Sequence, residues 1–200
     1  MGYQKGEKYP GTKIDEDDIL KIMETYDKNT VAGSRDRAIL AVMYRSGMRI
    51  AEALALMPEN LDRDQSFIRV LHGKGDKDRT VVMDDGGWSI MGRWLKKRAK
   101  ISNLPEDAPL FCSPSGKAIT QQNFRKVLYI HAKKAGVKAR VNPHGFRHSH
   151  AFEMASEGIQ PHIIQEQLGH ASLERTQVYL KHLCPTDVRS ALEKRVWAYG

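Results

Sequence analysis

Hydrophobic residues recur along most of the chain at the three- and four-residue spacing of amphipathic helices. Asp15 stands where it can cap a first helix, and Ile14 and Ile19 are placed for a hydrophobic staple. A second helix is expected from about residue 34 to Gly47, because glycine readily takes the left-handed conformation that ends helices. The same spacing predicts further helices at residues 49–57, 88–101, 120–135, 143–157, 160–168, 173–181 and 186–198.

Two segments break this helical pattern. Residues 66–71 and 79–83 are rich in strand-forming residues, and residues 72–78 between them read His-Gly-Lys-Gly-Asp-Lys-Asp. Because glycine and aspartate favour turns, the pattern predicts a β-hairpin with lysines at its tip. Short strands at 110–112 and 117–119 are candidates for extending the sheet. The predicted fold class is α+β, mostly helical with a small antiparallel β-sheet, in one domain preceded by a polar linker or stub at 1–13.

Composition excludes several classes of protein. The chain has 200 residues, 40% of them hydrophobic and 28% charged, which is a globular balance and argues against disorder. Its longest apolar run, residues 38–44, is far shorter than the roughly 20 residues that a membrane-spanning helix needs. The first ten residues contain no apolar stretch typical of a signal peptide. Two cysteines, Cys112 and Cys184, do not make a disulfide scaffold, so a reducing cytoplasmic location is expected.

The charge distribution points to a polyanionic partner. The formal net charge is +8, and residues 108–152 contain eight Lys and Arg but no Asp or Glu. A one-signed block of this kind generates a positive surface potential suited to nucleic acid. The alternative is a solvated face that keeps the protein soluble. Apolar residues at helical spacing interleave the block, which indicates a folded surface rather than a basic tail.

Four short segments could carry chemistry. In the segment His144-Gly-Phe-Arg147 two hydrogen-bond donors share one helix face, an arrangement suited to phosphate. Leu168-Gly-His170 and the later Tyr179 form a second candidate cluster, although a satisfied histidine and a half-buried tyrosine would look the same. Arg49 follows a helix break, and Glu52 could hold its guanidinium or form an ordinary surface ion pair. Gly73-Lys74-Gly75 lacks the spacing of a nucleotide-binding P-loop.

Together and in this order, the four segments resemble the tyrosine recombinase (phage integrase) family. The matching stretches are SGMRIAEAL, GKGDKDR, HGFRHSHA and LGHASLERTQVY, and the resemblance covers residues 14–182, the family's catalytic domain. It implies that residues 1–13 are a linker or the stub of an absent N-terminal core-binding domain, and that the chain is either an isolated catalytic domain or a single-domain recombinase. It also implies that Glu52 supports the first arginine. The implied catalytic residues are Arg49, Lys74, His144, Arg147, His170 and Tyr179.

The resemblance implies site-specific DNA strand exchange through a covalent 3′-phosphotyrosyl intermediate. Tyr179 would be the nucleophile, and Arg49 and Arg147 would stabilise the charge that develops on the phosphate. His170 would add a donor, and His144 would be a base or an orienting residue. Lys74 would protonate the departing 5′ oxygen, with Lys77 as the alternative acid. Two other functions stay open: a DNA-binding accessory protein that does not cut, and DNA relaxation of the type IB topoisomerase kind.

The partners and cofactors follow from the same resemblance. No cofactor and no metal is expected, since side chains supply the cations. A zinc site of His144, His148 and His150 is disfavoured because no acidic residue stands between the histidines, as the H-E-x-x-H motif of zinc proteases requires. The partner is double-stranded DNA, bound by a monomer in solution that becomes a tetramer on DNA, with the helix at 186–200 packing on its own domain or on a neighbour. Side chains of base-reading or phosphate-binding type are expected to contact the DNA: Lys77, Arg79, Gln121, Gln122, Asn123, Arg125, Lys138 and Arg140.

Overall fold

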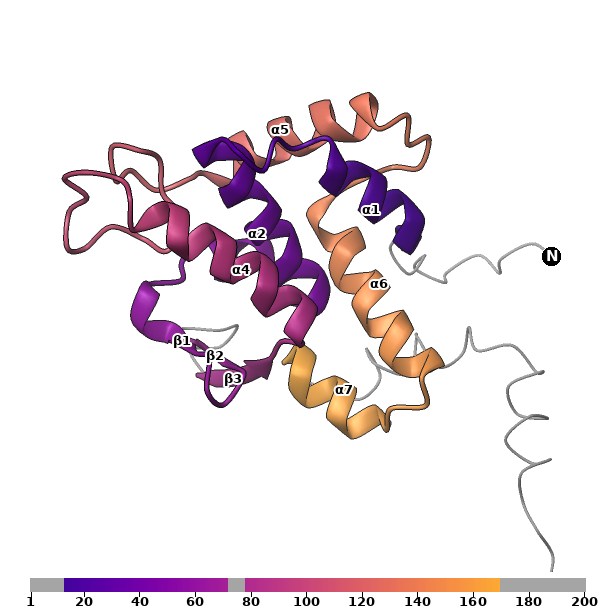
Figure 1. Ribbon diagram of the computed structural model, residues 1–200. Helices are drawn as coiled ribbons and strands as arrows, with labels where there is room; N and C mark the ends of the chain where they lie inside the picture. The colour runs from indigo at the N-terminus through magenta and orange to yellow at the C-terminus, as the bar shows by residue number, and fades with distance from the viewer. Residues whose placement is uncertain (1–12, 72–77, 170–200) are drawn as a thin grey trace, which may run out of the picture.

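A computed structural model describes residues 13–71 and 78–169 of the chain, which form a group of helices with a small sheet at one edge (Figure 1). The predicted hairpin tip and the predicted helices at 173–181 and 186–198 lie outside the described residues. The elements, in chain order, are α1 (Glu16–Glu24), α2 (Val31–Arg45), α3 (Ile50–Leu54), the 3₁₀ turn η1 (Pro58–Asn60), β1 (Leu61–Asp62), β2 (Phe67–Val70), β3 (Arg79–Val82), α4 (Asp85–Arg98), α5 (Gln121–Lys134), α6 (Pro143–Ser156) and α7 (Pro161–Leu168).

Helix α2 is the centre of the fold, with α4 and α6 packed against it (Figure 1). The apolar run at 38–44 lies in this helix, and every residue of the run is buried. A helix that is apolar around its circumference has to be covered on several sides, which explains its central place. It begins three residues earlier than predicted, because the Thr30 hydroxyl caps it by accepting a hydrogen bond from the Gly33 amide at 3.0 Å.

The sheet has three antiparallel strands in the order β1, β2, β3. The predicted hairpin is confirmed in its two strands, which pair Phe67 with Val82 and Val70 with Arg79. The expectation that 110–112 and 117–119 extend the sheet is wrong, because these segments form only a bridge to each other. The carbonyl of Leu110 instead accepts a hydrogen bond from the Trp94 indole at 3.0 Å, which ties this loop to α4.

The ends of two predicted helices differ in detail. Asp15 takes the N-cap position of α1, but its carboxylate pairs with Lys13 at 3.2 Å instead of capping the helix. Helix α3 is shorter than the predicted 49–57, because the chain turns into η1 at Pro58. The helices predicted at 120–135, 143–157 and 160–168 are confirmed as α5, α6 and α7. In the described part of the chain, no helix has the length and apolar character needed to cross a membrane.

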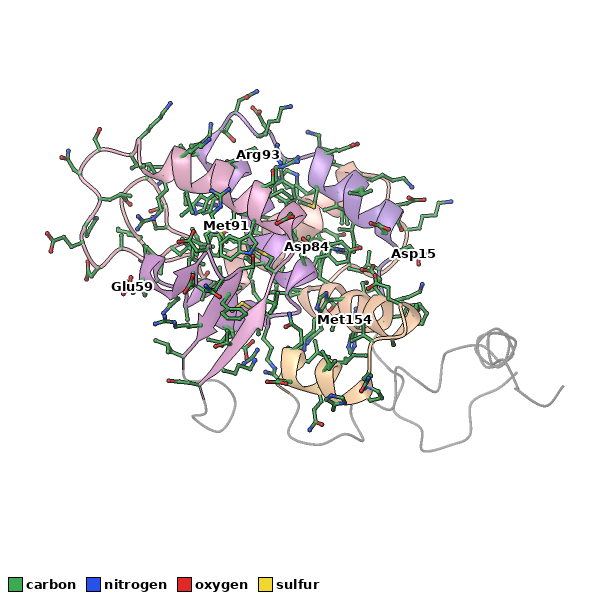
Figure 2. All side chains as sticks on the ribbon, turned by 60° about the horizontal axis from the view of Figure 1, so that its bottom comes forward. Asp15, Glu59, Asp84, Met91, Arg93 and Met154 are labelled. Atoms are coloured by element: carbon green, nitrogen blue, oxygen red, sulfur yellow. The ribbon has the colours of Figure 1, made fainter. Side chains whose placement is uncertain are left out.

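Helices α6 and α7 form a second, smaller apolar cluster beside the main core. Its buried members are Ala151, Ala155, Ile164 and Leu168, with Met154 packed against them (Figure 2). Helix α7 lies against β3, so the end of α7 is brought next to the base of the hairpin. This packing places three segments that are distant in sequence around one location: the start of α3, the start of α6 and the end of α7.

Candidate active site

Arg49 and Glu52 form one side of this location. Arg49 occupies the N-cap position of α3, two residues after the left-handed Gly47. Its Nη1 donates to Glu52 Oε1 at 2.8 Å, and its backbone amide donates to Glu52 Oε2 at 2.8 Å. The predicted contact between the two side chains is therefore present. It is not the ordinary surface ion pair that was the alternative, because the Glu52 side chain is only 8% exposed.

Arg79 is a second arginine on the same carboxylate, and the sequence did not indicate it. From the first position of β3, its Nη1 donates to Glu52 Oε1 at 3.0 Å and its Nη2 to Oε2 at 2.8 Å. The two residues are 27 positions apart in sequence, so no local spacing reveals the pair. The expectation that Arg79 contacts a DNA phosphate stays a prediction, but its guanidinium is directed at Glu52 inside the fold.

The two arginines keep Glu52 ionised. Burial alone raises the pKa of this carboxyl, but hydrogen bonds from Arg79 and from the Arg49 amide outweigh burial and bring the pKa to about 2. A carboxylate fixed by four donors is a rigid support for Arg49. The folded-state pKa lies below that of the unfolded chain, so the resulting stability is present above about pH 4.5 and is lost as the pH falls toward 2.

We expect Glu52→Gln to lower the free energy of unfolding by about 3 kcal/mol at pH 7, because each unit of pKa shift corresponds to roughly 1.4 kcal/mol. This difference in the free energy of unfolding is expected to fall to about half by pH 3. At that pH the carboxyl is mostly protonated in the unfolded chain, so ionised Glu52 stabilises the folded state by less. Urea unfolding at pH values from 7 to 3 measures this difference in the free energy of unfolding. Glu59→Gln is a matched control at an exposed carboxylate (Figure 2). A pH-independent difference would contradict the assignment.

Arg147 joins the ends of two other helices from within the fold. It is 4% exposed and projects from α6. Its Nη1 donates to the Gly47 carbonyl at 2.6 Å, and its Nη2 donates to the Leu168 carbonyl at 2.5 Å. Gly47 has φ +67°, and a Cβ there would lie 2.6 Å from His150 Cδ2, so glycine is required both by conformation and by space. The predicted left-handed helix end at Gly47 is thus confirmed.

His144 lies at the first turn of α6 and is exposed, unlike Arg147 on the same helix. Burial of part of the ring lowers the pKa of His144 below its usual value. The positive charges that lower this pKa further belong to Arg147, Arg49 and Arg125. The imidazole is therefore neutral at neutral pH, with a nitrogen able to accept a proton. The structure thus brings His144, Arg147 and Arg49 into one electropositive site.

Lys74, His170 and Tyr179 lie outside the described residues, as does Lys77. Gly169, which directly precedes His170, ends α7 with φ +62°, as the sequence predicted. The segment that leads to His170 therefore begins next to the Arg147 contact with Leu168.

The candidate DNA-contacting residues of the acid-free block are largely exposed. Thr120 caps α5 by accepting from the Asn123 amide at 3.1 Å, and Gln122, Asn123 and Arg125 are exposed at the first turns. Gln121 is half-buried and accepts a hydrogen bond from Arg125 at 3.1 Å. Lys138 and Arg140 are also exposed, in the loop after α5. The positive charge of Arg125 contributes to the lowered pKa of His144.

A histidine outside the candidate site makes contacts with neighbouring side chains. His131 stacks on Tyr26 with ring centroids 3.6 Å apart and shares a hydrogen bond with Thr25 at 2.8 Å. The rings of His144 and His148, two of the zinc candidates considered, have centroids 6.4 Å apart. Within residues 13–71 and 78–169, no group of three or more His, Cys, Asp and Glu side chains is arranged to hold a metal ion.

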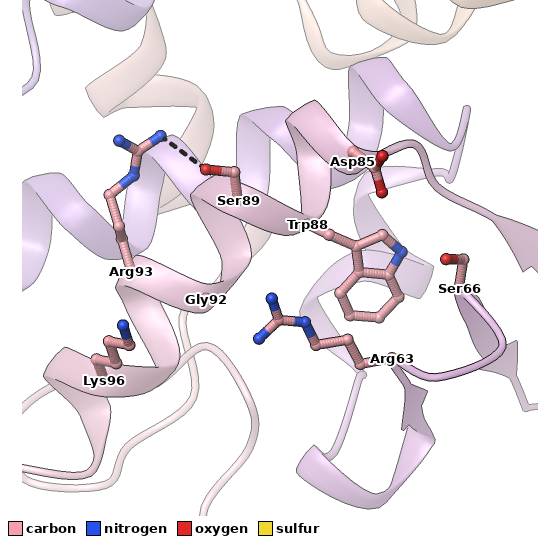
Figure 3. A pocket seen from close by; sticks show the side chains of 8 residues that line it. All are labelled: Arg63, Ser66, Asp85, Trp88, Ser89, Gly92, Arg93 and Lys96. Atoms are coloured by element: carbon pink, nitrogen blue, oxygen red, sulfur yellow. Dashed lines mark hydrogen bonds between the residues drawn. The ribbon is translucent and has the colours of Figure 1, made fainter.

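A groove lies apart from this site, between α4 and the turn that joins β1 to β2 (Figure 3). Arg93, one of its lining residues, donates a hydrogen bond from Nη2 to the hydroxyl of Ser89 on the same helix at 3.5 Å. None of the residues singled out from the sequence lines this groove, so it is separate from the candidate site. Its lining residues are Arg63, Ser66, Asp85, Trp88, Ser89, Gly92, Arg93 and Lys96.

The sequence is similar to characterised proteins over most of its length. The model of the Phage integrase family matches residues 12–184. Tyrosine recombinase XerD of Staphylococcus aureus (strain N315) is 33% identical over 174 residues, covering 86% of this chain and 58% of the relative. Tyrosine recombinase XerC of Thermodesulfovibrio yellowstonii is 35% identical over 175 residues, covering 84% of this chain and 58% of the relative. The chain therefore spans less than two thirds of these relatives.

Solved structures share the fold. The crystal structure of XerA recombinase matches with a TM-score of 0.78 and 28% identity, covering 96% of this chain and 68% of that one. XerH site-specific recombinase, bound to a palindromic difH substrate in a post-cleavage complex, matches with a TM-score of 0.74 and 28% identity. That match covers 95% of this chain and 54% of XerH. The mostly helical fold with a small antiparallel sheet is thus the one predicted.

Proposed function

The chain belongs to the phage integrase family, the tyrosine recombinases, and from that premise we propose that it is the catalytic domain of a site-specific DNA recombinase. The observation that carries the proposal is the convergence of Arg49, His144 and Arg147. Arg147 donates a hydrogen bond to the Gly47 carbonyl, two residues before Arg49, so the start of α6, which also carries His144, lies beside the start of α3. A site of this composition suits a phosphodiester, and the XerH neighbour was solved bound to its palindromic difH substrate in a post-cleavage complex.

In the proposed reaction, the Tyr179 hydroxyl attacks the scissile phosphorus. The new bond joins the tyrosine oxygen to a 3′ phosphate, and the bond to the 5′ oxygen breaks. The departing oxygen takes a proton from Lys74, while neutral His144 accepts or orients the proton of the tyrosine. Arg49 and Arg147, with His170, donate to the non-bridging oxygens as negative charge develops.

The second half of the reaction reverses these roles. The 5′ hydroxyl of a partner strand attacks the phosphotyrosine, the tyrosine leaves, and the DNA backbone is rejoined. Because the phosphotyrosyl bond retains the energy of the broken phosphodiester, no ATP is needed. All charge stabilisation comes from side chains, so the proposal involves neither a cofactor nor a metal.

A covalent-trapping experiment tests this function. The chain is incubated with a pool of nicked duplexes tiled over the genomic DNA on both sides of its gene, then denatured and separated by size. A nick a few nucleotides to the 3′ side of the break lets the short fragment with the free 5′ hydroxyl diffuse away, so a recombinase accumulates as a denaturation-resistant protein–DNA adduct. An accessory DNA-binding protein gives a shifted band before denaturation and no adduct after it.

A second assay separates recombination from relaxation. Duplexes that yield adducts are placed in pairs on a supercoiled plasmid, and the products are mapped. Exchange of flanking DNA between two sites supports the recombinase. Relaxation of the supercoiled plasmid without exchange of flanking DNA would instead indicate an activity like that of a type IB topoisomerase.

The proposed assembly is a monomer in solution that forms a tetramer on two duplexes. The sequence of residues 186–200 predicts an amphipathic helix, with Val188, Leu192 and Val196 four residues apart on one face. If this helix packs on a neighbouring subunit, cleavage depends on assembly. We expect deletion of residues 186–200 to impair recombination more than DNA binding, as measured by plasmid exchange and by titration. A stable tetramer of the intact chain without DNA, detected by light scattering, would contradict the proposal.

A further inference from the structure

We infer that Arg79 is a positioning residue for strand cleavage, which acts on the reaction by holding Glu52 and, through it, Arg49. The inference rests on the proposed function and departs from the phosphate contact that the sequence suggested for Arg79. It follows from three groups of contacts: those on Glu52, those on Gly169, and those that fix the strand from which Arg79 projects.

The first group is the complete occupation of the Glu52 carboxylate. Oε1 accepts from the Nη1 atoms of Arg49 and Arg79, at 2.8 and 3.0 Å. Oε2 accepts from the Arg49 amide and from Arg79 Nη2, both at 2.8 Å. The charged groups that face Glu52 are thus these two arginines. The Arg79 side chain is 14% exposed and that of Arg49 22%, so Arg49 is the more accessible of the two to a phosphate.

The second group links Arg79 to the end of α7. A Cβ placed on Gly169 would lie 2.7 Å from both Cδ and Nε of Arg79. The Arg79 side chain therefore runs directly against the backbone of Gly169, whose φ of +62° also favours glycine. Arg79 thus contacts Glu52, in the helix that begins after Arg49, and Gly169, the residue that precedes His170 in the sequence.

The third group fixes β3 itself. The side-chain amide of Gln167 in α7 accepts from the Val82 amide at 3.0 Å and donates to the Val82 carbonyl at 2.7 Å. The same amide donates to the Ser46 carbonyl at 3.1 Å, just before Gly47. Strand β3, the end of α2 and the end of α7 are therefore held together independently of Arg79. This arrangement brings Arg79 into its position between Glu52 and Gly169.

Removal of Arg79 is expected to slow cleavage without a matching loss of DNA affinity. Arg79→Met leaves Glu52 with two of its four donors, so Arg49 is less firmly held. A displacement of about 1 Å in a catalytic group can cost roughly 100-fold in rate, and we expect a loss of that order in adduct formation. Arg79→Lys restores the charge but not the two-point contact, so its rate should lie between those of the methionine variant and the wild type.

The experiment measures two quantities in each variant. The first is the single-turnover rate of adduct formation, with DNA affinity titrated in parallel. The second is the pKa of Glu52, followed by carbon-13 NMR of labelled glutamate and assigned by loss of the signal in Glu52→Gln. Arg93→Met, an exposed arginine of α4, controls for loss of a charge (Figure 2). Gln167→Ala controls for a weaker contact between α7 and β3, because it leaves the partners of Glu52 in place.

The expected result is a slow Arg79→Met, partial rescue by Arg79→Lys, and a Glu52 pKa raised by about one unit or more in the methionine variant. A methionine variant that cleaves within about threefold of the wild type overturns the inference. So does an unchanged Glu52 pKa, or a loss of DNA affinity as large as the loss of rate, which would identify a phosphate contact. If the wild type forms no adduct, the proposed function fails, and the Glu52 pKa still decides whether Arg79 holds Glu52.

Discussion

Replacement of Arg147 by lysine is expected to reduce the rate of adduct formation by about 100- to 1,000-fold, the usual cost of removing a donor that stabilises transition-state charge. The guanidinium of Arg147 is planar and is already oriented by the carbonyls of Gly47 and Leu168. Lysine keeps the positive charge but cannot hold both carbonyls and present a fork of donors to a phosphate. The loss should therefore appear in the rate of cleavage at saturating DNA.

Stability measurements separate this effect from damage to the fold. Arg147→Ala leaves the Gly47 and Leu168 carbonyls without these donors, at a cost of roughly 1–3 kcal/mol for each buried group left unpaired. Arg147→Lys can retain one of the contacts and should unfold closer to the wild type. If the lysine variant cleaves DNA within about tenfold of the wild-type rate, Arg147 holds the helix ends together and is not a transition-state donor.

Tyr179→Phe is expected to abolish the covalent adduct, because the variant keeps the aromatic ring and lacks only the attacking oxygen. Its DNA affinity should stay within about twofold of the wild type, since DNA binding depends mainly on cationic contacts to phosphates. Denaturing electrophoresis of the nicked-duplex reactions measures the adduct, and titration of the same duplexes measures affinity.

Tyr129→Phe is a matched control for this variant, because Tyr129 is an exposed tyrosine on α5 and has no role in the proposed chemistry. It should form the adduct at the wild-type rate. Any adduct that persists in Tyr179→Phe means that another residue is the nucleophile, and the assignment of Tyr179 would then be wrong.

Local signals in the sequence were enough for much of the fold. Gly47 and Gly169 mark helix ends because their conformations disfavour other residues, and both positions were predicted. The paired strands of the hairpin follow from their composition and from the turn residues between them. The start of α2 was missed because the first turn after its cap, Thr30, contains Gly33 and Ser34, which form helices less readily than the residues that follow. The segments at 110–112 and 117–119 look like strands, but tertiary contacts decide which sheet a strand can join.

The candidate site was predictable where motifs are local and unpredictable where contacts are distant. Arg49, His144 and Arg147 were identified from the order of the four segments. Spacing within a helix suggested that His144 and Arg147 project together, but not that Arg147 would be buried between two backbone carbonyls. The contact between Arg147 and Gly47 joins residues 100 positions apart. For Arg79 the sequence suggested only a contact with DNA. Its contact with Glu52 was missed because the two residues lie on different elements, 27 positions apart.

Identification of the residue that carries the DNA tests the proposed mechanism most directly. The adduct formed by the wild-type chain is digested with nuclease and protease, and the peptide that retains a nucleotide is sequenced by mass spectrometry. We predict a single modified residue, Tyr179, joined through a phosphodiester to the 3′ end of the cleaved strand. A nucleotide on any other residue, or a 5′ linkage on Tyr179, would contradict the proposed mechanism.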